Sequence, residues 1–112
     1  MNVETISEIL RTVPREKAFY FFTSIGNYTG VSASSLKEFM EKINEVSVKS
    51  LEFHLYRGDF EKWIDETLED KKLVAEIRSL RSLNHFGTVL KEHLYGIIAK
   101  RYEGLSGDFK IL

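Results

Sequence analysis

Four residues within one short stretch carry side chains that could take part in chemistry. His54 and Arg57 are three residues apart, which places them on one face if the stretch is helical. Gly58 can turn the chain and bring the carboxylate of Asp59 close to both. A histidine titrates near neutral pH, and one beside an arginine, an aspartate and the indole of Trp63 could transfer a proton or bind an anionic or planar ligand. His54, Arg57, Asp59 and Trp63 therefore form the candidate ligand or partner site.

The same residues also have a structural interpretation, which we favour. Asp59 suits the N-cap of a helix that starts at Phe60, and Gly58 suits the left-handed residue that closes the preceding helix. Trp63 shares a helical face with Phe60, so we expect a buried core residue, and His54 then needs only one satisfying hydrogen bond. The spacing assembles no nucleophile, base and orienting group, so no catalytic residue is predicted and an enzyme is the less favoured reading.

Other motifs carry weaker signals. The segment from Gly26 to Gly30 precedes a serine-rich helix start and could cradle a phosphate with its backbone amides, but it lacks the lysine and spacing of a phosphate-binding loop. His85 and His93 are eight residues apart, not at the four-residue spacing of a helical metal pair. The chain has no cysteine. We therefore predict no metal site and no cofactor.

Composition narrows the class of protein. The chain has 112 residues, which predicts one globular helical domain over residues 1–112. Sixteen Lys and Arg against 17 Asp and Glu give a net charge of −1, without the basic surplus typical of nucleic-acid binders. No apolar run is long enough to span a membrane and no signal peptide starts the chain, so we expect a cytoplasmic protein that binds neither membrane nor nucleic acid. The surplus of Glu and Lys over Asp and Arg is typical of thermophiles.

Hydrophobic periodicity and capping residues predict an all-α fold, a compact array of five or six short helices. Ser35, Ser47, Asp59 and Asp70 would each cap a helix, while Pro14 would end the first one. A loop is expected over Thr23–Ser32, and a final helix over about Asn84–Tyr102, with Phe86 and Val89 facing inward and Gly104 and Gly107 ending it. The apolar residues 18–22 have no period and could be a helical turn or a strand. The alternative is thus an α+β fold with a small two-stranded ribbon from residues 18–25 and 50–56.

The chain around His54 and Arg57 resembles an uncharacterised, largely archaeal family of prokaryotic domains. The most distinctive part is Phe53-His54-x-x-Arg57-Gly58-Asp59-Phe60-x-x-Trp63-Ile64, and the similarity extends over about residues 18 to 83. The resemblance implies a small helical domain in an archaeal setting. It brings no established activity and no catalytic residue to carry over.

The leading functional prediction is a small non-enzymatic protein-interaction or regulatory module that binds another protein or a second copy of itself. An aromatic content of 12% in so short a chain leaves apolar surface for an interface. The alternative is a small-ligand-binding domain or enzyme with its site around His54, Arg57 and Asp59.

Overall fold

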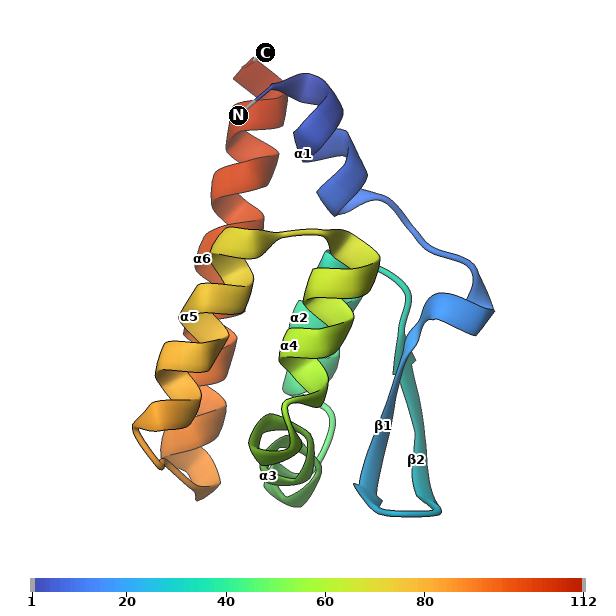
Figure 1. Cartoon of the computed structure of the whole chain (residues 1–112), viewed down its shortest axis with the longest axis vertical. Coiled ribbons are helices and arrows are strands. Elements are labelled where there is room, and N and C mark those ends of the chain that lie inside the picture. Colours follow the sequence, from blue (N-terminus) through green and yellow to red (C-terminus); the bar gives the residue numbers. More distant parts are fainter. Residues whose placement is uncertain (1, 112) are drawn as a thin grey trace.

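The computed structural model describes residues 2–111, with side chains described through residue 109. Along the chain the elements are α1 (Val3–Leu10), the 3₁₀ turn η1 (Arg15–Lys17), β1 (Phe19–Ser24), β2 (Asn27–Ala33), α2 (Leu36–Ile43), α3 (Val48–Arg57), α4 (Asp59–Trp63), the π-helical turn η2 (Ile64–Leu68), α5 (Lys71–Ser82) and α6 (Gly87–Ile111). The long helix α6 packs against α1, α2, α3 and α5, and the hairpin of β1 and β2 forms the opposite side of the molecule (Figure 1). Helix α3 crosses one end, between the hairpin and α6.

The hairpin was not expected as such. β1 and β2 pair antiparallel, and Gly26 makes the turn between them with a φ of 79°, a backbone conformation that residues with a Cβ rarely adopt. Gly30 also has a positive φ, of 86°, and lies where the register between the strands shifts. The predicted loop over Thr23–Ser32 is therefore wrong. Aromatic and β-branched residues, which favour strands, lie among the glycines of this segment, and it forms part of a bulged hairpin.

The predicted all-α class is wrong as well. The described residues form six α-helices and a two-stranded antiparallel sheet, which is an α+β fold. The alternative prediction fits in class, and residues 18–25 do contain its first strand. Its second strand is Asn27–Ala33 instead of residues 50–56, which lie in α3 because helical spacing buries Leu51 and Leu55 on one face.

Local capping chemistry explains most helix starts, as predicted. The hydroxyl of Ser35 accepts a hydrogen bond from the Glu38 N–H at 3.1 Å, and that of Ser47 accepts one from the Ser50 N–H at 3.4 Å. Asp70 caps α5 by accepting from the Leu73 N–H at 3.2 Å. These caps fix where α2, α3 and α5 begin.

Asp70 also connects α5 to α6. Its carboxylate pairs with the guanidinium of Arg101, with Nε 2.8 Å from Oδ2 and Nη2 3.0 Å from Oδ1. Both side chains are largely buried. One aspartate thus starts α5 and fixes α6 beside it.

The C-terminal region departs from the prediction in two ways. Helix α6 continues through Gly104 and Gly107 to Ile111, because Leu105 between the two glycines is buried against the rest of the core. Phe86 and Val89, expected to face inward, are exposed because α6 starts only at Gly87 and presents its first turn to solvent. Of the helices in the described chain, none combines the length and the apolarity needed to cross a membrane.

Candidate functional site

The turn between α3 and α4 brings three of the four candidate residues together. Gly58 adopts a φ of 78° and ends α3, as predicted, and α4 starts at the next residue. Asp59 is therefore the first helical residue and not a cap: no side chain caps α4. Its carboxylate accepts a hydrogen bond from His54 instead, which corrects the predicted capping role.

His54 uses both ring nitrogens within the protein. The N–H of Phe22 in β1 donates to Nε2 at 2.8 Å, so Nε2 carries the lone pair and the ring proton resides on Nδ1. Nδ1 then donates to Oδ2 of Asp59, also at 2.8 Å. Ser50, one turn earlier on α3, donates its hydroxyl to the Phe22 carbonyl at 2.7 Å. Two side chains of α3 thus satisfy both backbone groups of one residue in β1 and attach the hairpin to the helix.

The surroundings of His54 favour the neutral ring. Burial lowers the pKa of His54 below the ordinary histidine value of 6.5, because a buried imidazolium loses its hydration. The hydrogen bond to Asp59 and the charge of Asp59 oppose this shift, while the charge of Arg57 adds to it. A neutral His54 is also the only form that can accept from Phe22.

Arg57 lies at the edge of this cluster. Its Nε is 3.4 Å from Oδ2 of Asp59, and its guanidinium carbon lies 4.7 Å from the centre of the Phe53 ring. The side chain is 48% exposed, so these contacts orient the guanidinium without covering it. Arg57 is the cation of the cluster that a ligand could still reach.

Trp63 belongs to the core, as predicted, and lies apart from the other three. It is 8% exposed, its ring packs edge-on against Phe19, and its Nε1–H donates to the Lys17 carbonyl at 2.8 Å. The indole secures η1 to α4 and does not line the pocket beside His54.

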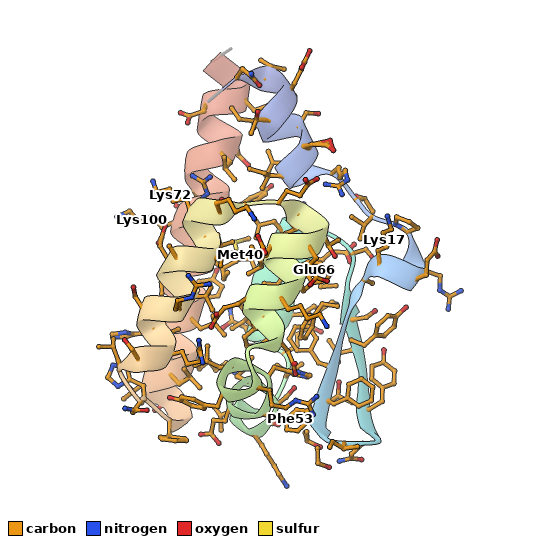
Figure 2. All side chains as sticks on the ribbon, in the orientation of Figure 1. Lys17, Met40, Phe53, Glu66, Lys72 and Lys100 are labelled. Atoms are coloured by element: carbon orange, nitrogen blue, oxygen red, sulfur yellow. The ribbon has the colours of Figure 1, made fainter. Side chains whose placement is uncertain are left out.

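A pocket of about 420 Å³ opens between the hairpin and α3, and we call it the hairpin pocket. Figure 2 shows Phe53 beside the end of the hairpin. The lining is mostly apolar, with the histidine, arginine and aspartate at one side: Phe19, Tyr20, Phe22, Ser24, Ile25, Gly26, Phe53, His54, Arg57 and Asp59. This places His54, Arg57 and Asp59 at one pocket.

Sequence reasoning missed the hairpin's share of this pocket. Tyr20, Phe22 and Ile25 supply much of its apolar lining, and Ile25 at the turn is 85% exposed. The available signal was the aromatic run 19–22 followed by Gly26, which fits a strand and a tight turn.

The two weaker motifs of the sequence, the glycine segment and the histidine pair, do not form binding sites among the described residues. In the segment from Gly26 to Gly30, Gly26 lies in the hairpin turn and the other residues belong to β2, so the segment does not form a loop that leads into a helix N-terminus. The rings of His85 and His93 do meet, with 4.8 Å between their centres, which their spacing did not suggest. Within the described part of the chain, no group of three or more His, Cys, Asp or Glu side chains is placed to hold a metal ion.

Comparison with known proteins adds a family. No curated protein and no solved structure matches the chain significantly. One family model matches residues 2–99, which covers most of the chain and includes both the hairpin and the α3–α4 turn. The chain therefore belongs to the Family of unknown function (DUF5752).

Proposed function

We propose that this protein is a binding module that receives an apolar side chain of a partner protein in the hairpin pocket. The observation that carries the proposal is the pocket itself, an apolar hollow with Arg57 at its edge and the exposed Ile25 at its mouth. Aromatic residues and arginine are the types that dominate binding energy at protein interfaces. Tyr20 and Tyr28, whose rings lie 5.8 Å apart on the hairpin, add exposed aromatic surface nearby.

The state of His54 favours binding over catalysis. A general base needs a free lone pair within reach of the proton that it removes. In His54 that lone pair accepts from the Phe22 N–H, and the other nitrogen donates to Asp59. Both ring nitrogens of His54 are therefore engaged in hydrogen bonds that hold the pocket wall together, and neither is available for proton transfer to a ligand.

The hairpin offers side chains rather than its backbone to a partner. A regular exposed strand edge can pair with a strand of another protein, but a bulge interrupts such pairing. The register of β1 and β2 shifts around Phe22, and Thr29 uses its hydroxyl to bond the Phe21 carbonyl across the irregularity. The pocket is the better receptor.

A displayed library of random peptides tests the proposal. The full chain should select peptides that share a large apolar residue, and Ile25→Asp should abolish their binding because it places a charge at the pocket mouth. Ile25 is exposed, so the fold should survive. Val3→Asp is the matched control, since Val3 is also exposed but begins α1, which lies at the other end of the molecule from the hairpin turn (Figure 1). Equal loss of binding in both variants, or none in Ile25→Asp, would contradict the proposal.

A small organic ligand is the second candidate. The pocket volume of about 420 Å³ lies within the range of roughly 300–1,000 Å³ that small-molecule sites span. Phenylbutyrate, which joins an aromatic ring to a carboxylate, is a suitable probe for NMR titration. Saturable shifts at His54 and Phe22 without any selected peptide would favour this candidate.

A further inference from the structure

A second hollow lies on the other side of α3 and contains arginine. It measures about 370 Å³ and is lined by Tyr56, Arg78, Arg81, Ser82 and Asn84; we call it the arginine pocket. Tyr56 is the neighbour in sequence of Arg57, which lines the hairpin pocket. The last turn of α3 therefore separates two hollows and contributes a residue to each.

The charges on this side of the protein are arranged unevenly. Glu61 on α4 is only 11% exposed and accepts from Arg81, with distances of 2.8 Å to Nε and 3.4 Å to Nη2. Its Oε2 also lies 3.5 Å from Nε of Arg78, which is 64% exposed. Asp59 stands in the same relation to Arg57, since the carboxylate is the less exposed partner. In each group the anion faces inward and the guanidinium faces outward.

The lining of the arginine pocket itself is cationic. Its two guanidiniums, of Arg78 and Arg81, share the carboxylate of Glu61, and none of the residues that line the pocket is acidic. Burial and then the charge of Glu52 raise the pKa of Tyr56, so this carboxylate lies nearby, where it accepts a hydrogen bond from the Gly87 N–H. The lining of this pocket thus carries two guanidiniums and no carboxylate, although the chain as a whole has a net charge of −1. Guanidinium groups bind oxyanions through paired N–H donors, and Arg78, at 3.5 Å from Glu61, is held less closely than Arg81, at 2.8 Å.

Exposed apolar residues border the arginine pocket. Phe86 stacks on Tyr56 with 5.0 Å between ring centres, and both Phe86 and Leu83 are exposed. A ligand bound here would meet cationic donors and aromatic surface together. This combination fits an acidic side chain within an apolar segment.

We propose that the arginine pocket binds an acidic group of the same partner segment whose apolar side chain enters the hairpin pocket. The partner is then an acidic, apolar stretch of another protein that crosses the last turn of α3. This inference rests on the proposed function for the nature of the partner, while the arginine pocket itself can be tested separately.

The first test uses peptides selected on the unchanged protein. Their sequences should be enriched in Asp and Glu beside the apolar residue. Arg78→Ala should weaken their binding about tenfold, as expected for the loss of one interfacial charge pair. Glu61 keeps its contact with Arg81, so the variant should fold. Lys72→Ala removes an equal charge from the same helix, outside the arginine pocket, and should change binding less than twofold.

A second measurement keeps the two proposals apart. A hexaglutamate peptide, which has no apolar side chain, should shift the backbone amide signals of Ser82 and Asn84 in NMR spectra, and Arg78→Ala should remove these shifts. If Ile25→Asp abolishes peptide binding but Arg78→Ala acts like Lys72→Ala, the hairpin pocket stands and the arginine pocket is refuted. Absence of hexaglutamate shifts in the unchanged protein also overturns the inference, whatever the library yields.

Discussion

The backbone N–H of Phe22 donates a hydrogen bond to Nε2 of His54, which lies 32 residues further along the chain. The bond requires an unprotonated nitrogen, and an imidazolium carries N–H groups at both positions. Protonation of His54 would therefore set two donors against each other at the junction of β1 and α3. The attachment of the hairpin is coupled to pH through this single contact.

We predict that the stability of the protein falls as the solution is acidified, with His54 as a cause. The pKa of His54 is lowered in the folded state, mainly by burial, so the unfolded chain binds a proton more readily. The free energy of unfolding should therefore rise with pH between the lowered folded-state pKa and 6.5. The contribution of His54 to this free energy is fully present above pH 6.5 and is lost as the pH falls through the folded-state pKa. Urea unfolding from about pH 8 to about pH 5 measures this. His54→Gln should flatten the dependence in that window, whereas the control His85→Gln/His93→Gln should retain it.

Neighbouring charges should move the pKa of His54 in opposite directions. Arg57 lowers this pKa, so Arg57→Ala should raise it; Asp59 raises it, so Asp59→Asn should lower it. The asparagine oxygen can still accept from Nδ1–H, which keeps the ring in place. An NMR titration of the His54 ring gives both values, and Lys49→Ala on the same helix should leave the pKa in place. Shifts of the same sign in both variants would contradict this electrostatic description.

Trp63 should be a determinant of stability. Trp63→Ala removes a buried indole from an aromatic core and leaves the Lys17 carbonyl without its donor. We expect a loss of about 3–5 kcal/mol, a large part of the stability of a small domain. Trp63→Phe should cost less, because it keeps most of the apolar volume. Thermal or urea denaturation measures both, and a parent-like melting temperature for Trp63→Ala would show that the core does not depend on this side chain.

Local chemistry made several elements predictable. Ser35, Ser47 and Asp70 cap helices because each precedes an apolar periodic stretch, and Gly58 closes α3 because glycine tolerates the left-handed conformation. Trp63 is buried because its face is set by its own helix. These features depend on residues within a turn or two, where sequence patterns carry the information.

Features that depend on distant contacts were mispredicted or missed. Asp59 has the right type and position for a cap, but α4 begins at Asp59 itself and its carboxylate accepts from His54, whose ring is oriented by the distant Phe22 N–H in β1. Gly104 and Gly107 lie within α6 although each costs about 1 kcal/mol in a helix, because burial of Leu105 outweighs that cost. The hairpin pocket was missed because no local pattern joins Phe22 to His54.

Asp70 and Asp65 allow buried and exposed ion pairs to be compared within one segment. Asp70 is almost fully buried with Arg101 and also caps α5, so Asp70→Ala should cost about 3–5 kcal/mol. Asp65 pairs with Lys71 at the surface, where both side chains are well exposed, and Asp65→Ala should cost less than about 1 kcal/mol. Denaturant unfolding of both variants measures the difference. Similar losses would mean that the junction of α5 and α6 does not depend on the buried pair.

Glu69 should be replaceable with a gain in stability. It ends η2 in the left-handed conformation, with φ 59° and ψ 39°, where a side chain costs roughly 1–2 kcal/mol. Glycine avoids this cost but loses more chain entropy on folding, so we expect Glu69→Gly to stabilise the protein by up to about 1 kcal/mol. The measurement is the free energy of unfolding in urea.

Two control substitutions separate the backbone effect from the loss of the carboxylate. Glu69→Ala removes the same charge but keeps the Cβ, so it should bring no comparable gain. Glu66→Gly, inside η2 where φ is negative, should instead cost about 1 kcal/mol. A gain of equal size in Glu69→Ala would attribute the effect to the charge. A loss of stability in Glu69→Gly would mean that the backbone strain at Glu69 is smaller than the extra chain entropy that glycine loses on folding.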